Sequence, residues 1–331
     1  MLHEGSRWGK VRGEEPPGWR SVDRWATAGA ERDMAGKRKI AHEPGPGPGA
    51  EAGDGSVQSL YADPTVYDIL YTPGTAAEMD ALERVERALA RTARLREDRL
   101  WFEPACGTGR CLRVAARRGR RVAGFDREPA MLEYAGRRLG PKTPLASPGR
   151  RDPAAPRLFQ ADLADFAHAA RKAGLKPGTV DFAFVTVNSL RHLATDRAML
   201  AHFAQMAELL RPGALYVVGL SLTDYDWLWP DEDLWTAARG RCRVSQLINW
   251  LPPEPGTVRG RRERAISHLT VERPGTTGHF DDAYDLRCYD QRQWRALVNK
   301  SPLEHAGSFN GLGRPLPPGI WPYQLEALRR P

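Results

Sequence analysis

An acidic residue stands just ahead of a glycine-rich turn in the stretch WFEPACGTGRCL, residues 101–112. Turns of this composition end a strand, open a helix and let the backbone approach a nucleotide closely, because glycine lacks a Cβ. Glu103 precedes the turn, and Gly107 and Gly109 form it. Asp126 follows Gly109 by 17 residues, at the end of another apolar segment, where an acidic side chain can accept hydrogen bonds from ribose hydroxyls. These residue types and spacings predict a nucleotide-binding cleft.

The turn fits neither of two common phosphate-binding patterns. In the dinucleotide pattern G-x-G-x-x-G the third glycine would fall at Leu112, and the phosphate loop G-x-x-x-x-G-K-[ST] needs a lysine that does not follow. A carboxylate also repels a pyrophosphate, by roughly 1 kcal/mol at 4 Å in water and by more in a cleft. Glu103 therefore favours a positively charged ligand, and S-adenosylmethionine carries a sulfonium and an ammonium but no phosphate.

The motifs along the chain follow in the order EPACGTGR, VAGFDREPAML, FQADLADF, VDFAFVTVNSLRHL and LLRPGALYVV. In order and spacing they resemble the sheet motifs of the class I S-adenosylmethionine-dependent methyltransferases, over about residues 99–221. The segment from about 240 to 290 resembles, more loosely, the antiparallel strands added in small-molecule methyltransferases. The resemblance implies an α/β fold with a doubly wound, seven-stranded Rossmann-like sheet and an added antiparallel β lid.

Carried onto this sequence, the resemblance gives each cofactor-binding position a role. Glu103 faces the methionine end of the cofactor, the two glycines of the turn let the backbone approach that end, and Asp126 accepts hydrogen bonds from the ribose. Asp162 and the backbone of Leu163 face the adenine, although Asp162 competes with Asp165 for a helix N-cap role. Further positions beside the cofactor are Ala105, where many family members have glycine, and Arg127, Met131, Tyr71 and Asn188.

Methyl transfer is an in-line displacement in which the protein mainly aligns the reactants and excludes water. A base is needed only when the nucleophile carries a proton, so few catalytic residues are expected. The candidates are Asn188, beside the sulfonium and the acceptor, and His192, whose ordinary pKa lies near neutrality. His192 alternatively fixes the turn after the strand through a hydrogen bond to a loop carbonyl.

The segment NSLRHL (188–193) lacks the proline-aromatic loop of methyltransferases that act on base amino groups, and it lacks a nucleophilic cysteine. Metal-assisted methylation would require paired acidic or amide ligands, so we expect no metal. We therefore predict a small-molecule acceptor with a nitrogen or oxygen nucleophile. Tyr67, Trp250 and Arg262 are predicted to line its pocket. Core packing is the alternative for Tyr67 and Tyr71, and a position on the surface is the alternative for Trp250 and Arg262.

The elements that must position these residues alternate along the chain. Strands are predicted at 99–103, 121–126, 157–163, 180–187 and 214–221, and helices at 59–71, 75–95, 108–118, 129–139, 164–173, 196–210 and 291–300. Alternating runs within 241–290 predict antiparallel strands, and EHAGSF and YQLEALRR predict closing edge strands. In a doubly wound sheet, ligands bind beyond the carboxyl ends of the strands, which brings the candidate residues to one edge.

Composition separates residues 1–55 from residues 56–331, which we expect to form the methyltransferase domain. The first segment has few aliphatic residues and a PGPGPG run, and we expect a disordered leader. Its nine Lys and Arg balance its nine Asp and Glu, so the net charge of +8 comes from the rest of the chain. There the arginines are scattered without interleaved aromatics, so we do not expect a nucleic-acid partner. No signal-peptide or membrane-helix pattern occurs, and we expect a cytoplasmic protein.

Three alternatives stay open at this stage. The positive charge would suit an RNA or protein methyltransferase, although the base-flipping loop is missing. A non-catalytic S-adenosylmethionine-binding protein would share the cleft. A nicotinamide-dependent dehydrogenase is opposed by Leu112 and Glu103.

Overall fold

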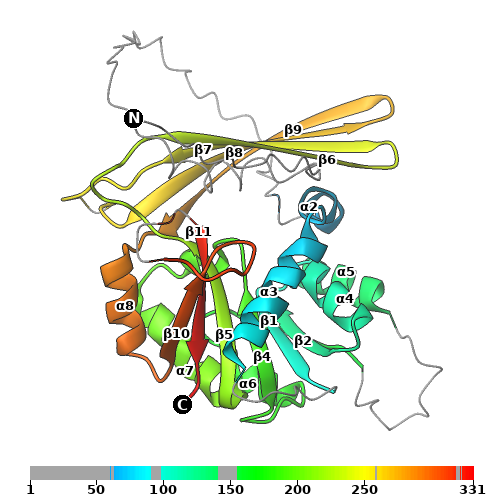
Figure 1. Cartoon of the computed structure of the whole chain (residues 1–331). Coiled ribbons are helices and arrows are strands. Elements are labelled where there is room, and N and C mark those ends of the chain that lie inside the picture. Colours follow the sequence, from blue (N-terminus) through cyan, green and yellow to red (C-terminus); the bar gives the residue numbers. More distant parts are fainter. Residues whose placement is uncertain are drawn as a thin grey trace, which may run out of the picture.

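The computed structural model describes residues 60, 63–90, 98–140, 155–257, 259–317, 321 and 323–331. The leader predicted for residues 1–55 lies outside the described residues. A seven-stranded sheet flanked by helices forms the larger part, and a separate four-stranded sheet lies against one end of it (Figure 1).

The seven-stranded sheet has the order β10-β11-β5-β4-β1-β2-β3. Its strands are β1 (Leu100–Pro104), β2 (Arg121–Asp126), β3 (Arg157–Gln160), β4 (Val180–Val185), β5 (Leu210–Ser221), β10 (Glu304–Phe309) and β11 (Tyr323–Arg329). The strands from β3 to β5 pair in parallel, whereas β11 pairs antiparallel with both of its neighbours. The predicted doubly wound α/β sheet is confirmed.

The two closing strands were predicted to lie at an edge, which is right for β10 and wrong for β11. β11 is inserted between β5 and β10, and its side chains from Gln324 to Arg329 are buried. The apolar character of Leu325, Ala327 and Leu328 suits an interior strand, which is covered on both faces.

Helices cover both faces of this sheet. They are α3 (Thr75–Leu89), α4 (Arg110–Arg117), α5 (Pro129–Leu139), α6 (Ala167–Lys172), α7 (Asp196–Leu209) and α8 (Gln291–Asn299). Trp101 on β1 packs in the core beneath α3, α4 and α5, whereas its neighbour Phe102 packs in the core beneath α6, α7 and α8. Successive strand residues point to opposite faces, so each strand contributes to both cores.

The four-stranded sheet is built from consecutive antiparallel hairpins in the order β6-β7-β8-β9. Its strands are β6 (Asp231–Arg239), β7 (Cys242–Leu251), β8 (Arg262–Arg273) and β9 (Thr276–Arg287). The sequence predicted the last three but not β6, whose segment DEDLWTAAR carries three acidic residues. β6 is an edge strand of which only one face is covered: Trp235 packs inward, whereas Leu234 is exposed.

Helix α2 (Pro64–Tyr71) lies beneath the four-stranded sheet and connects it to the larger domain (Figure 1). It starts later than the predicted 59, because the Asp63 side chain accepts from the amides of Thr65 and Val66 and caps the helix there. Val66, Ile69 and Leu70 of α2 share a small apolar core with residues of β7 and β8.

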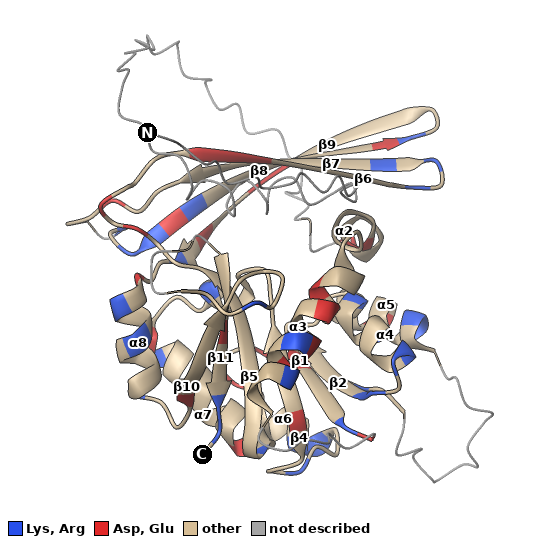
Figure 2. Ribbon diagram, viewed as in Figure 1, with Lys and Arg blue, Asp and Glu red and all other residues tan. Residues whose placement is uncertain are grey.

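The short helix η2 (Ser189–His192) follows β4 and contacts β9. The four-stranded sheet thus meets the larger domain at the carboxyl ends of the parallel strands. None of the helices in the described part of the chain has the length and apolar character that crossing a bilayer needs. Figure 2 shows basic and acidic residues interspersed over both sheets and their helices.

Candidate active site

A small cavity opens where β1 and β4 end, next to α2. Its lining residues come from α2, the β1–α4 turn and the β4–η2 turn, and they are Tyr67, Glu103, Ala105, Cys106, Arg110, Val185, Thr186, Val187 and Ser189. Because this is the switch point of a doubly wound sheet, it is the position where such sheets bind ligands.

The glycine turn is held in left-handed backbone conformations. Gly107 has φ +51° and Gly109 has φ +68°, and a Cβ on Gly109 would lie 3.1 Å from the Ala135 Cβ. Ala105 adopts φ +50° without being glycine, a backbone conformation that glycine adopts more readily.

Non-glycine residues with positive φ in the described part of the chain are Ala105, Val187 and Asn188, and all three lie at this cleft. For the β-branched Val187 such a conformation is strained, and strained backbone accumulates at binding sites. The structure therefore concentrates backbone strain around the cavity.

Glu103 is buried at the end of β1, and its Oε2 has no hydrogen-bond partner among the described residues. Burial raises the pKa of Glu103 to about 8 against the lowering effect of Arg110, and the nearby carboxylates of Glu78 and Asp126 also raise it. An orphaned carboxyl oxygen at the wall of a cavity is costly unless a ligand supplies the donor. The Oε2 of Glu103 is therefore available to accept a hydrogen bond from a cationic or other hydrogen-bond-donating group of a ligand.

Asp126 ends β2 and is already connected to the glycine turn. Its Oδ2 accepts from the Gly107 amide at 2.7 Å and its Oδ1 accepts from the Glu128 amide at 3.0 Å. Burial raises the pKa of Asp126 against the lowering effect of these donors. Of the two neighbours predicted to bind the cofactor, Arg127 is exposed and pairs with Glu128, whereas Met131 is buried.

The predicted adenine side lies after β3. Asp162 is exposed, and its Oδ1 accepts from the Ala164 amide at 2.8 Å. The Leu163 carbonyl is bonded at 2.7 Å to Nδ1 of His202, whose Nε2 is 2.7 Å from the Tyr216 hydroxyl. Burial lowers the pKa of His202 to about 4, so the ring is neutral at neutral pH. Its two hydrogen bonds connect the segment after β3 to β5. The sequence analysis did not single out His202.

Asn188 ties β4 to β5 with its side chain. Its Oδ1 accepts from the Ser221 amide at 2.6 Å, and its Nδ2 donates to the Ser221 hydroxyl at 3.1 Å. Both ends of the amide are therefore used to fix the turn. A direct contact with an acceptor would have to compete with these bonds.

His192 ends η2 and faces the four-stranded sheet, with its ring centroid 5.4 Å from that of Tyr284. Solvent reaches the side chain, yet the surrounding protein desolvates the ring and lowers the pKa, and the charges of Arg127 and Arg191 lower it further. The neutral, proton-accepting form therefore dominates at neutral pH. Arg191 fixes η2 to the sheet by donating to Glu263 Oε2 at 2.7 Å.

The two tyrosines of α2 differ in what they contact. Tyr67 lines the cavity, where its Cε1 lies 3.4 Å from the position of a Cβ on Gly107. Tyr71, predicted to bind the cofactor, packs against Tyr67 with the ring centroids 4.6 Å apart and the planes tilted by 37°, and it donates its hydroxyl to Gln246 Oε1 of β7 at 3.0 Å. The ring nearer the glycine turn is thus Tyr67, which was predicted to bind the acceptor.

Trp250 and Arg262 lie on opposite faces of the four-stranded sheet. Trp250 shares the inner face of β7 with Gln246, and its Nε1 donates to Asp233 at 2.9 Å. Arg262 is exposed and alternates with the inward-facing, buried Ala265 and Ser267 of β8. The structure therefore does not support the prediction that Arg262 lines the acceptor pocket.

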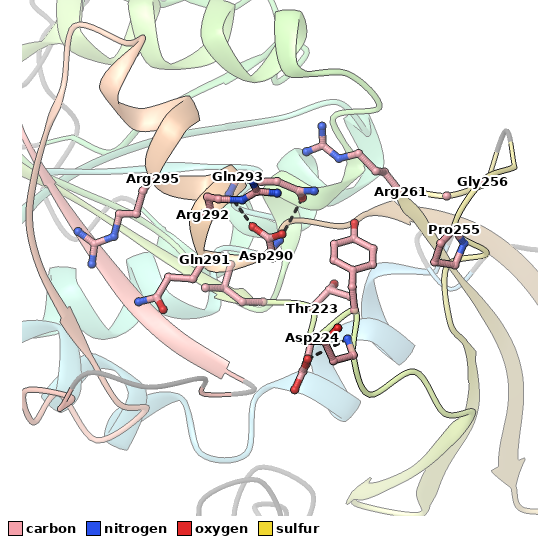
Figure 3. A pocket seen from close by; sticks show the side chains of 14 residues that line it. Thr223, Asp224, Pro255, Gly256, Arg261, Asp290, Gln291, Arg292, Gln293 and Arg295 are labelled. Carbon is pink, nitrogen blue, oxygen red and sulfur yellow. Dashed lines mark hydrogen bonds between the residues drawn. The ribbon is translucent and has the colours of Figure 1, made fainter.

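A larger cleft of about 900 Å³ opens beyond the end of β5 (Figure 3). It is lined by the β5–β6 connection, the β7–β8 connection and the start of α8, including Tyr225, Arg261, Asp290 and Arg292. Arg261 also donates to Asp196 at 2.9 Å, which connects this cleft to the segment after η2. No periodic pattern in the sequence indicates this cleft, because most of its lining comes from the connections between elements.

Comparison with known proteins gives consistent results. Residues 102–213 match the family model described as a methyltransferase domain. No curated protein matches the chain. The crystal structure of DesVI from Streptomyces venezuelae is similar with a TM-score of 0.60 and 22% identity, over 81% of this chain and 98% of that one.

Two further structures show a similar likeness. CalS10 from Micromonospora echinaspora, described as a SAM-bound amino pentose methyltransferase, has a TM-score of 0.56 and 18% identity over 81% of this chain and 95% of that one. KedS8 from Streptoalloteichus sp ATCC 53650, described as a sugar N-methyltransferase, has a TM-score of 0.55 and 20% identity over 88% and 100%. At these identities the likeness shows the fold.

Proposed function

Since residues 102–213 match the family model described as a methyltransferase domain, we propose that this protein transfers a methyl group from S-adenosylmethionine to a nitrogen or oxygen atom of a small-molecule acceptor. The observation that carries the proposal is the buried, unpartnered carboxyl oxygen of Glu103 at the cavity wall. A cationic cofactor satisfies this oxygen, whereas a pyrophosphate would meet two acidic residues, Glu103 and Asp126.

The residues around the cavity fit this cofactor. Glu103 would accept hydrogen bonds from its ammonium, the backbone of Gly107 and Gly109 would approach its methionine chain, and Asp126 would accept from the ribose. Leu163 and Asp162 would border the adenine. When bound, S-adenosylmethionine supplies a methyl group that its sulfonium activates, so the protein's main task is alignment.

The acceptor would lie beside His192, under the inner face of the four-stranded sheet. His192 is neutral at neutral pH and can take the proton that the nucleophile loses. Tyr67 and Trp250 would offer aromatic faces to the acceptor. A part of the acceptor remote from the nucleophile could occupy the cleft beyond β5, which is connected to η2 through Asp196 and Arg261.

A nitrogen acceptor is supported by two of the similar proteins, which are described as a sugar N-methyltransferase and an amino pentose methyltransferase. The similarity extends over 95% of the amino pentose methyltransferase and 100% of the sugar N-methyltransferase. We therefore place small amines of the amino-sugar type first among the acceptors to test.

The experiment is an incubation of the protein with S-adenosylmethionine labelled in its methyl group and a panel of small amines and alcohols. Transfer of label to a panel member, lost in Asp126→Ala, is the expected result. RNA and a protein lysate serve as competing acceptors, and label that enters only these would contradict a small-molecule acceptor.

A further inference from the structure

We propose that Arg110 binds the α-carboxylate of the cofactor and so makes the site select a ligand with an intact amino-acid end. This rests on the proposed function, because it assumes that an adenosyl cofactor occupies the cavity beside Glu103. The sequence analysis did not give Arg110 a role.

Arg110 is a buried cation at the cavity wall. It is the first residue of α4, its side chain is nine-tenths buried, and it lines the cavity together with Glu103. A buried charge is costly unless it is paired, so its presence here needs an explanation.

Part of that explanation is a fixed support from α3. The Arg110 guanidinium donates to both carboxylate oxygens of Glu78 and, at 3.1 Å, to the Thr75 hydroxyl. Burial acts to raise the pKa of Glu78, but Arg110 holds it below its ordinary value, so the pair is ionised. These three bonds use three of the five N–H donors of a guanidinium. The other two donate to no described residue, which leaves them for a ligand.

Beside Arg110, the N-terminus of α4 also favours a carboxylate, although Glu103 and Asp126 make the rest of the site acidic. The N-terminus of a helix carries a partial positive charge, so a cation at this position adds unfavourable energy that an anion relieves. The N-cap residue of α4, Gly109, provides no side-chain acceptor, so the first amides of the helix lack a side-chain cap. The negative charge of Glu78 balances the positive charge of the Arg110 guanidinium. The partial positive charge at the N-terminus of α4 remains.

The unpartnered Oε2 of Glu103 is the second, independent sign of a ligand at the same wall. Glu103 and Arg110 together present an acceptor and a donor to one cavity. An α-amino acid carries an ammonium and a carboxylate on the same carbon, which matches this pair. A nucleoside thioether without the amino-acid chain would satisfy neither group.

The test compares two ligands, S-adenosylhomocysteine and 5′-methylthioadenosine, which share the adenosyl thioether and differ in the amino-acid end. Calorimetric titrations of the full chain are made with Arg110→Gln, with Arg110→Lys and with Arg117→Gln. Arg117 is an exposed arginine of the same helix and is the matched control. The pair Glu78→Gln/Arg110→Gln removes both charges and gives a second variant if Arg110→Gln alone leaves Glu78 unpaired and unfolds.

We expect Arg110→Gln and the double variant to bind S-adenosylhomocysteine at least about tenfold more weakly, as loss of a charged hydrogen bond predicts. Their affinity for 5′-methylthioadenosine should change by less than about twofold, and Arg117→Gln should bind both ligands like the wild type. Arg110→Lys should retain part of the preference, because it keeps the charge but not the fork of donors.

Equal weakening for both ligands would mean that Arg110 only supports the turn, and unchanged affinity for both would mean that it does not touch the ligand. Either result overturns the inference while leaving the proposed function in place. A wild-type protein that binds neither ligand would overturn both.

Discussion

Binding of the cofactor should release a proton from Glu103. In the ligand-free protein, burial raises the pKa of this carboxyl to about 8, and Glu78 and Asp126 add to the shift while Arg110 opposes it. An ammonium placed at the unpartnered Oε2 stabilises the ionised form and lowers the pKa. Because binding favours the deprotonated form, affinity must increase as pH rises and level off above about pH 8.

The size of the effect follows from the same pKa. At pH 7 a group with a pKa of about 8 is about nine-tenths protonated, so about 0.9 protons should leave per bound cofactor. Removing that proton costs about 1.4 kcal/mol at pH 7, since one pKa unit corresponds to 1.36 kcal/mol. The dissociation constant should therefore fall about tenfold between pH 6 and pH 7.

The assay is calorimetric titration with S-adenosylhomocysteine in pairs of buffers that differ in ionisation enthalpy, from pH 6 to pH 8. The difference in heat between the buffers gives the number of protons released. Glu103→Gln is the matched variant: it keeps the shape, cannot ionise, and should lose the pH dependence along with part of the affinity.

Two results would refute this reasoning. A wild-type affinity that does not change between pH 6 and pH 7 would show that binding does not change the ionisation of Glu103. The same slope in Glu103→Gln would assign the proton to another group, such as Asp126.

Three further predictions concern the surroundings of the cleft. Asp68 is fully buried, and its carboxylate accepts from Arg113 at 2.6 Å and also pairs with Arg239 of the four-stranded sheet. Asp68→Ala should therefore lower the free energy of unfolding, measured in urea, by about 3 kcal/mol. A loss below about 1 kcal/mol would contradict a stabilising role. His192→Gln should lower kcat for an identified acceptor by about a hundredfold without changing S-adenosylhomocysteine affinity, whereas an unchanged kcat would leave only a structural role. Trp250→Ala should raise the acceptor KM while Arg262→Ala leaves it unchanged, and the reverse pattern in steady-state kinetics would contradict the assignment of the two faces.

The parallel part of the fold could be predicted because its signals are local. Continuous apolar strands such as 180–185 and the glycine turn after Glu103 specify their own conformation, so the cleft edge follows from the order of elements. β6 could not be predicted in this way, since an edge strand with one solvated face can carry acidic residues throughout. The interior place of β11 depends on pairing with β5, more than a hundred residues earlier in the chain.

The candidate site likewise combines residues that local motifs predict with residues that depend on long-range contacts. The structure places Glu103 at the cavity wall and Asp126 in a hydrogen bond with the glycine turn, and their roles toward the cofactor stay predictions. Arg262 was assigned to the pocket because alternating polar and apolar residues show that a strand has two different faces, but they do not show which face points toward the acceptor. Arg110 and His202 were missed, since their partners come from α3 and β5 and no short-range pattern marks them.

Titration of the wild-type protein with S-adenosylhomocysteine and, separately, with NAD tests most directly whether the cleft is shaped for a cationic adenosyl cofactor. We expect S-adenosylhomocysteine to bind in the micromolar range and NAD to give no saturable heat. Saturable binding of NAD without binding of S-adenosylhomocysteine would contradict the account.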